Sequence, residues 1–304
     1  MLDSIGKIVE AARGRRAGRL AIAAAHDADV LEAAAEAAEA GIVEPILVGD
    51  AAEIRRLLTV LGRKPADFSI VEAGNPADCA AAAARLVDEG KADFLMKGKL
   101  GTADLMKAVL DKNLSLRTGR LLSHVMLYEL PAYPRMLVLT DGGMNTFPDL
   151  AKKADILENA ARILGKLGYR SMTAACVCGS EVVDPRIQST LDAAALVGMQ
   201  ERWTPFGLKV IGPVGLDLAI SLEACRHKGY VEPGGGSADI LLVPTYEVGN
   251  GIGKTLTYFG KAMSAGIIAG AAVPIVLVSR SDEAAAKLAS IAFGAVISEK
   301  GVGL

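Results

Sequence analysis

Short apolar runs alternate with segments of helical periodicity along the whole chain, and this alternation most restricts the possible folds. Residues 19–25 (RLAIAAA) predict a strand, and residues 27–41 predict a helix. The same pair recurs at residues 44–50 and 51–62. The predicted strands are apolar throughout, which is typical of parallel strands covered by helices on both faces. The sequence therefore predicts an α/β protein with mostly parallel sheets.

The number of predicted strands indicates two sheets, because about ten strands already approach the limit of one open sheet. The chain has 304 residues, enough for two domains. Hydrophobic residues make up 51% and aromatic residues 4%, which favours helices packed closely on a sheet over an aromatic-rich β-sandwich. Residues 121–130 and 135–143 have little helix between them and are candidates to pair, with one antiparallel member. The turn-rich residues 140–149 (TDGGMNTFPD) are the best candidate for a seam between domains.

Charge and cysteine usage exclude several classes of protein. The 33 basic residues are balanced by 35 acidic ones, for a net charge of −2, and no basic stripe suggests nucleic acid. The four cysteines form no CxxC pair and no zinc spacing, so we expect no structural metal. Free buried thiols suit a reducing cytosol.

The longest uncharged stretch, residues 262–279, is borderline in length for a membrane span. Gly266, Gly270 and Pro274 interrupt it, so we interpret it as the end of a helix at residues 252–266 followed by a buried strand. The N-terminus shows no secretory signal pattern. We therefore expect a soluble cytoplasmic protein.

Polar and glycine residues gather where the predicted strands end, and ligands of open parallel sheets bind beyond those ends. Each group has a simpler explanation, such as solvated lysines or a turn aspartate. Together they predict a cleft for a small anionic ligand, and hence an enzyme acting on a phosphorylated or carboxylated metabolite. The groups are Lys97-Gly98-Lys99, Asp141 with its two following glycines, Gly215 with Asp217, residues 249–255, and Ser279-Arg280.

Residues 249–255 (GNGIGKT) match neither the phosphate-loop spacing nor the dinucleotide-binding spacing. Their glycines permit close backbone approach, a helix start is predicted to follow, and Lys254 adds a positive charge. These features favour a bound anion. An ordinary glycine-rich loop is the equally supported alternative.

The strand VPIVLV runs directly into Ser279-Arg280-Ser281-Asp282. One interpretation is a helix cap, with Ser279 or Ser281 at the N-cap and the acidic residues in the first turn. The other is an anion or group-transfer site at the end of a strand. The stretch by itself favours the cap.

Five ordered blocks of the sequence resemble the phosphate acetyltransferase/phosphate butyryltransferase family, and the butyryltransferases more closely. The blocks are LMKGKLGTADLMKAVLDK, LTDGGMN, GPVGLDLAISLEACRHKG, LLVPTYEVGNGIGKTLTYF and VPIVLVSRSDEAAAKLASIA. The resemblance implies a two-lobed α/β/α fold of the isocitrate/isopropylmalate dehydrogenase type. The first domain would comprise residues 1–145 plus 271–304. The second, residues 146–270, would be inserted into it and form a dimer interface, with the active site in the cleft between the domains.

The reaction that the resemblance implies is reversible transfer of a short acyl group, with butyryl favoured, between CoA and inorganic phosphate. Arg280 would bind phosphate, Ser279 would stabilise the developing oxyanion, and a carboxylate would act as general base. In the acetyltransferases of the family the pattern is Ser-Arg-Gly-Cys-Ser followed by acidic residues, and the segment of this chain is two residues shorter. The resemblance therefore implies Asp282 as the base, with Glu283 as second choice. With this resemblance, we favour a group-transfer site at Ser279-Arg280-Ser281-Asp282 over a helix cap alone.

Further residues are implied to bind phosphate or CoA: Lys97, Thr102, Lys107, Asp141, Asn250, Gly251, Gly253 and Lys254. The implied substrates are acyl-CoA and phosphate, without a metal or redox cofactor. The resemblance also implies a homodimer or higher homo-oligomer, and it suggests neither nucleic acid nor membrane as a partner.

Two alternatives remain open. A metal-dependent hydroxyacid dehydrogenase of the same two-lobed fold should carry an aspartate cluster at a strand end, and we find none in the sequence. A non-catalytic protein that binds acyl-CoA or another metabolite would bind without turnover.

Overall fold

The computed structural model describes residues 1–278 and 283–298, and it contains two compact units. The N-terminal unit comprises residues 6–120 together with the described residues from 265 onward. The inserted unit comprises residues 1–5 and 121–264. Each unit is built around its own set of mostly parallel strands, and each is described by itself below.

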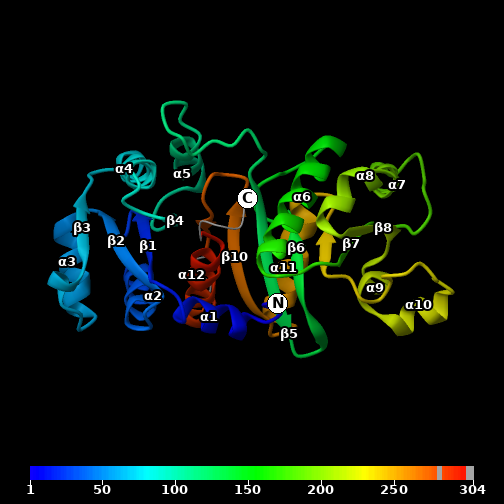
Figure 1. Ribbon diagram of the computed structural model, residues 1–304, viewed down its shortest axis with the longest axis horizontal. Coiled ribbons are helices and arrows are strands. Elements are labelled where there is room, and N and C mark those ends of the chain that lie inside the picture. The colour runs from blue at the N-terminus through cyan, green and yellow to red at the C-terminus, as the bar shows by residue number, and fades with distance from the viewer. Residues whose placement is uncertain (279–282, 299–304) are drawn as a thin grey trace. The chain divides into compact units, whose positions relative to one another are not determined.

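The strands of the N-terminal unit are β1 (Gly18–Ala23), β2 (Val43–Gly49), β3 (Ser69–Glu72), β4 (Phe94–Lys97), β10 (Met263–Ala269) and β11 (Ile275–Val276). Their order is β3-β2-β1-β4-β11-β10 (Figure 1). All neighbours are parallel except β10 and β11, which are antiparallel. The central strand β1 is fully buried from Leu20 to Ala23, as its apolar sequence predicts.

The helices of this unit are α1 (Ile5–Arg13), α2 (Ala28–Glu39), α3 (Ala51–Val60), α4 (Pro76–Asp88), α5 (Thr102–Val109) and α12 (Ala284–Ser298), with a 3-10 turn at Pro65–Asp67. Helices α4 and α5 lie on one face of the sheet, and α2, α3 and α12 lie on the other (Figure 1). Buried alanines on α2 and α4 allow this close packing. Asp27, Asp50 and Asn75 cap α2, α3 and α4, each accepting a hydrogen bond from a first-turn backbone N–H.

The strands of the inserted unit are β5 (Ser123–Leu130), β6 (Tyr133–Thr140), β7 (Met172–Val177), β8 (Leu208–Val214) and β9 (Ile240–Leu242), in the order β5-β6-β9-β7-β8. Strands β5 and β6 form an antiparallel pair, and the remaining neighbours are parallel. The prediction that the runs at 121–130 and 135–143 pair with one antiparallel member is therefore confirmed.

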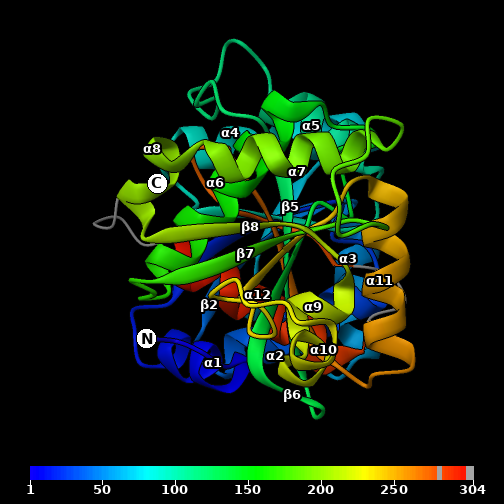
Figure 2. The same cartoon turned by 90° about the vertical axis from the view of Figure 1, so that its right-hand side faces the viewer.

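The helices of the inserted unit are α6 (Leu150–Lys166), α7 (Gln188–Gly198), α8 (Gln200–Trp203), α9 (Leu216–Ile220), α10 (Leu222–Lys228) and α11 (Tyr246–Tyr258), with a 3-10 turn at Thr204–Phe206. Figure 2 shows α6, α7 and α8 on one side of β7 and β8, and α9 and α10 on the other. Both units thus have helices on both faces of a mostly parallel sheet, which confirms the predicted α/β class.

Two sequence-based boundaries differ from the structure. Residues 263–269 form β10, whereas the sequence placed residues 252–266 in one helix. The helix ends at Tyr258 and the chain turns through Gly260 and Lys261, the latter with a φ of 52°, before the apolar run pairs with β11. Residues 121–145, predicted in the first domain, group with the inserted unit because β6 pairs with β9.

No helix in the described residues has the length and apolarity needed to cross a membrane. Within the same residues, no group of three or more His, Cys, Asp or Glu side chains is placed to hold a metal ion.

Candidate functional site

The three residues predicted to carry the chemistry, Ser279, Arg280 and Asp282, lie outside the described residues. Their described neighbours are Val278, which follows β11, and Glu283, whose carbonyl accepts hydrogen bonds from the backbone N–H groups of Ala286 and Lys287. Glu283 therefore immediately precedes α12 instead of lying within its first turn, as the cap interpretation expected. The helix nevertheless begins directly after the predicted site.

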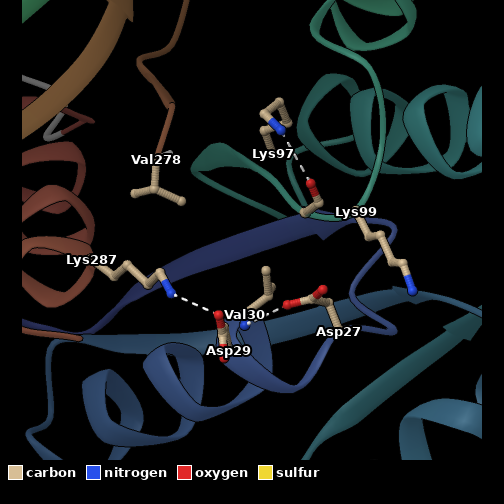
Figure 3. A pocket seen from close by; sticks show the side chains of 8 residues that line it. Asp27, Asp29, Val30, Lys97, Lys99, Val278 and Lys287 are labelled. Atoms are coloured by element: carbon tan, nitrogen blue, oxygen red, sulfur yellow. Dashed lines mark hydrogen bonds and ion pairs between the residues drawn. The ribbon is translucent and has the colours of Figure 1, made fainter. Parts of the chain in front are cut away.

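A pocket of about 140 Å³ opens in the N-terminal unit beyond the carboxyl ends of β1 and β4 (Figure 3). This is the edge where ligands of open parallel sheets bind. Val278 forms part of the wall, and Ser279 and Arg280 are the next two residues in the sequence. The lining residues are Asp27, Asp29, Val30, Lys97, Gly98, Lys99, Val278 and Lys287.

Close backbone packing holds the Lys97-Gly98-Lys99 turn at the carboxyl end of β4. The N–H groups of Gly98 and Lys99 donate to the carbonyls of Ala23 and Ala24, at 2.9 and 2.8 Å. A Cβ at Gly98 would lie 2.6 Å from the Ala23 carbonyl oxygen, so only glycine fits. Ala24 itself has a φ of 56°, a conformation that costs a non-glycine residue energy and is common at functional sites.

The two lysines of this turn lie differently. The Lys97 ammonium donates to the carbonyls of Gly98 and Leu100, at 3.3 and 3.2 Å, and is half-buried. Lys99 is exposed at the pocket wall. Its positive charge also contributes to lowering the pKa of the Glu53 carboxyl, after the larger effect of the hydrogen bond from Arg56. The two lysines of the turn therefore create a positive electrostatic potential at the carboxyl end of β4.

The opposite wall of the pocket carries an ion pair between α12 and α2. The Lys287 Nζ lies 3.3 Å from Asp29 Oδ2 (Figure 3). The Lys287 side chain is 7% exposed, whereas that of Asp29 is 64% exposed. Asp27 caps α2 by accepting a hydrogen bond from the Val30 N–H at 3.2 Å. Sequence reasoning missed Lys287, and the available signal was a lone lysine among the apolar residues of the last helix.

Two predicted CoA- or phosphate-binding residues, Thr102 and Lys107, belong to α5 and do not line this pocket. Thr102 is half-buried at the first position of the helix, after Gly101 at the N-cap. Lys107 is exposed in the last turn. Their roles stay predictions.

Asp141 organises the loop that follows β6 in the inserted unit. Asp141 is 2% exposed. One carboxylate oxygen accepts the backbone N–H groups of Gly143 and Met144, both at 2.8 Å. The other accepts the His124 N–H at 3.0 Å and the Asn145 side-chain amide at 2.6 Å. These hydrogen bonds hold the loop after β6 in place. That Asp141 also binds phosphate or CoA stays a prediction.

The predicted glycine-rich anion loop is wrong, because residues 249–255 lie inside α11. The helix starts at Tyr246 after Thr245, whose hydroxyl accepts the Val248 N–H. The Gly249 N–H donates to the Thr245 carbonyl at 3.1 Å, and Asn250, Gly251 and Gly253 follow in the helix interior. Backbone N–H groups in a helix interior are used by the helix itself, so they cannot cradle a phosphate.

Packing explains two of the three helix glycines. A Cβ at Gly253 would lie 2.6 Å from the Tyr128 hydroxyl, and Gly249 lies against Gly142. The structure thereby brings the Asp141 loop and α11 together within the inserted unit. Asn250 and Lys254 are exposed on α11, with the Lys254 ammonium 5.9 Å from the centre of the Tyr258 ring. Their side-chain roles stay predictions.

A pocket lined by lysines beyond the strand ends of an α/β protein is typical of proteins that bind small anionic ligands. The family model described as phosphate acetyl/butaryl transferase matches residues 4–76 and 56–295. The chain belongs to this family of acyltransferases. The acyltransferase prediction is thereby confirmed over the dehydrogenase alternative.

Relatives and solved structures agree with this assignment. The chain is 40% identical to a phosphate butyryltransferase of Clostridium acetobutylicum, covering 98% of this chain and 99% of the relative. It is also 40% identical to a phosphate acetyltransferase of Thermotoga maritima, covering 96% and 99%. A branched-chain phosphotransacylase from Enterococcus faecalis V583 superposes with a TM-score of 0.81 at 33% identity, covering 92% and 98%.

A more distant likeness concerns the fold alone. A 4-hydroxythreonine-4-phosphate dehydrogenase from Klebsiella pneumoniae matches with a TM-score of 0.55 at 14% identity, covering 93% of this chain and 100% of that one. The predicted architecture of dehydrogenase type is confirmed by this match, which says nothing about activity.

Proposed function

We propose that this protein interconverts butyryl-CoA and inorganic phosphate with butyryl phosphate and CoA. The observation that carries the proposal is the position of the lysine-lined pocket. Val278 forms its wall, and the next two residues along the chain are Ser279 and Arg280. A pocket of this charge beyond the ends of parallel strands suits a phosphate or an acyl phosphate.

The proposed reaction is a direct transfer. A phosphate oxygen attacks the thioester carbonyl carbon and forms a tetrahedral intermediate with a negatively charged oxygen. The C–S bond then breaks, the carbonyl reforms, and the CoA sulfur leaves as a thiolate that takes up a proton. In the reverse direction the thiolate attacks the acyl phosphate carbonyl and inorganic phosphate leaves. No electrons are exchanged with a third group, so the reaction needs no redox cofactor, and we assign no metal to it.

We assign three roles within the 279–283 segment. Arg280 would bind the phosphate through paired N–H donors, which match two phosphate oxygens. Ser279 would donate a hydrogen bond to the developing oxyanion. Asp282, or Glu283 in its place, would accept the proton of the CoA thiol. These roles rest on the sequence pattern and on the position of Val278 and Glu283 at either end of the segment.

The substrate-binding part of the proposal retains the remaining predicted residues. Lys97 would contribute charge at the mouth of the pocket, and Lys107 would bind CoA from the exposed face of α5. Thr102, Asp141, Asn250 and Lys254 would also bind phosphate or CoA. Gly251 and Gly253 are no longer assigned to a backbone cradle, because both lie within α11.

We propose that the protein acts in the cytoplasm as a homodimer. The four described cysteines are buried and free, as expected for a reducing compartment. We propose that the interface includes large apolar side chains of the inserted unit that are highly exposed; they are Phe147, Val182, Val231 and Phe259, at 71, 73, 91 and 86%. Light scattering after size-exclusion chromatography measures the mass directly, and a monomer would overturn this part.

The test of the activity is CoA release from butyryl-CoA, measured with a thiol-reactive dye, in the presence and absence of inorganic phosphate. The proposal expects phosphate-dependent release that falls by at least about a hundredfold in Arg280→Ala, because a charge-assisted bidentate contact is lost. Acetyl-CoA run in parallel ranks the acyl chains. Tight binding of butyryl-CoA without phosphate-dependent release would instead favour a non-catalytic binding protein.

A further inference from the structure

Lys287 carries a buried ammonium whose counter-ion among the described residues is an exposed carboxylate. The residue is 6% exposed, and within the described part of the chain its Nζ donates to Asp29 Oδ2 at 3.3 Å. An ammonium carries three N–H donors, so this contact uses one of them. The carboxylate of Asp29 is 64% exposed and is therefore screened by water. A buried charge with such a weak partner is costly unless another anion joins it.

The pocket in front of Lys287 is suited to that second anion. Its volume is about 140 Å³, several times the approximately 30 Å³ that one water occupies in the liquid, so a phosphoryl group fits. Lys97 and Lys99 line the same space. Of the two lining carboxylates, Asp27 is already used as the cap of α2. The first turn of α2 also borders the pocket, and a helix N-terminus favours negative charge.

We propose that Lys287 binds a phosphoryl group of the substrate in this pocket, an inference that rests on the proposed acyl transfer for the identity of the ligand. The Asp29 carboxylate pairs with the Lys287 ammonium when no anion is bound, and it competes with the anion for the ammonium. Lys287 is thus a substrate-binding residue, and Asp29 sets the strength of that binding. The phosphoryl group belongs either to inorganic phosphate or to CoA, and the experiment distinguishes these sources.

The matched variants are Lys287→Met and Asp29→Asn. Methionine keeps much of the aliphatic stem and removes the charge, whereas asparagine keeps the shape of Asp29 and removes the competing carboxylate. Both variants break the ion pair between α12 and α2. A purely structural role of the pair therefore predicts the same outcome for both, whereas a role in phosphoryl binding predicts opposite outcomes.

Steady-state kinetics provide the first readout. Lys287→Met is expected to raise the KM for inorganic phosphate by at least about tenfold, the effect of losing one charge-assisted hydrogen bond, with the KM for butyryl-CoA unchanged. Asp29→Asn is expected not to raise the KM for phosphate. A rise confined to the KM for butyryl-CoA would assign the phosphoryl group to CoA. Unchanged KM values for both substrates in Lys287→Met would overturn the proposal.

Thermal unfolding in potassium phosphate and in potassium chloride of equal ionic strength provides a readout that needs no turnover. Phosphate is expected to raise the Tm of the wild-type protein, to raise that of Asp29→Asn by more, and to raise that of Lys287→Met by less. Equal stabilisation of all three proteins would overturn the inference. The thermal measurement tests phosphoryl binding by Lys287 separately from the proposed acyl transfer. Phosphate can stabilise the protein through Lys287 even if no phosphate-dependent CoA release is found.

Discussion

Gly142 and Gly249 lie in direct backbone contact within the inserted unit. A Cβ at Gly249 would lie 2.7 Å from the Cα of Gly142 and 2.8 Å from Cγ2 of Val243. The loop after β6 and the first turns of α11 therefore approach more closely than any side chain permits. The glycines of this segment, which in sequence suggest an anion loop, are at this position a requirement of helix packing.

Gly249→Ala should lower the stability by about 1–3 kcal/mol, because the added methyl group must push α11 away from the loop. Urea unfolding followed by circular dichroism measures the change. The matched control is Gly251→Ala, on the same helix, where a Cβ would meet no atom within 4 Å. Alanine there should stabilise by about 0.5–1 kcal/mol. Similar losses in both variants would contradict the packing explanation.

Asp141→Asn should destabilise the inserted unit by at least about 2 kcal/mol, since the carboxylate is buried and accepts four hydrogen bonds. Asparagine has the same shape but turns an NH₂ group toward one pair of these N–H donors. The urea midpoint should fall without a change in the slope. An unchanged midpoint would show that Asp141 is not the organiser of this loop.

The buried pair Lys153–Asp192 joins α6 to α7 at 2.6 Å, with both side chains 7% exposed. Lys153→Met alone should cost about 3–5 kcal/mol, because it leaves the carboxylate buried without its cation. The double variant with Asp192→Leu should recover most of that loss, since Gln188, which also donates to Asp192, is exposed and can turn to water. Additive losses in the double variant would argue against this coupling.

The pair Arg19–Asp93 predicts a pH dependence. Burial alone would raise the pKa of the Asp93 carboxyl, but hydrogen bonds from the side chain and backbone N–H of Arg19 outweigh it and hold the pKa below the ordinary 3.8. A lowered folded-state pKa gives stability that is present above the unfolded value and is lost as the pH falls through the folded value.

Asp93→Asn should therefore lower the stability at pH 7 by about 1 kcal/mol, a modest value because both side chains are about a third exposed. The difference from the wild-type protein should begin to shrink below about pH 4, where Asp93 of the unfolded chain takes up a proton, and it should vanish as the pH falls through the lower folded-state pKa. Tm values measured from pH 7 to pH 2.5 check this. A difference that stays constant over the range would assign the effect to packing.

Much of the fold could be predicted from the sequence because the signals were local. Apolar runs marked most strands, and the capping residues Asp27, Asp50 and Asn75 stand where helices begin. Strand β10 was missed because its apolar residues continue from a helical pattern without a strong break, and only pairing with β11 decides their conformation. The grouping of residues 121–145 likewise depends on a pairing, between β6 and β9, that no local pattern indicates.

The candidate site was predictable only in part. Lys97 could be found because a lysine beside a glycine at a strand end is a local pattern. The function of the glycines in α11 could not, because a Cβ at Gly253 is excluded by Tyr128, far away in sequence. For Lys287 the sequence offered only a lone lysine in an apolar helix, because its burial and its pairing with Asp29, 258 positions away in the chain, are seen only in the structure. The predicted residues 279, 280 and 282 lie outside the described part of the chain.

The most direct test of the central claim is ³¹P NMR of the protein with butyryl-CoA and inorganic phosphate, with released CoA counted in the same sample. The account predicts a butyryl phosphate resonance that grows in a one-to-one ratio with CoA, and its loss in Arg280→Ala. CoA release without an acyl phosphate resonance would show a thioester hydrolase, and it would contradict the claim that phosphate is the acyl acceptor.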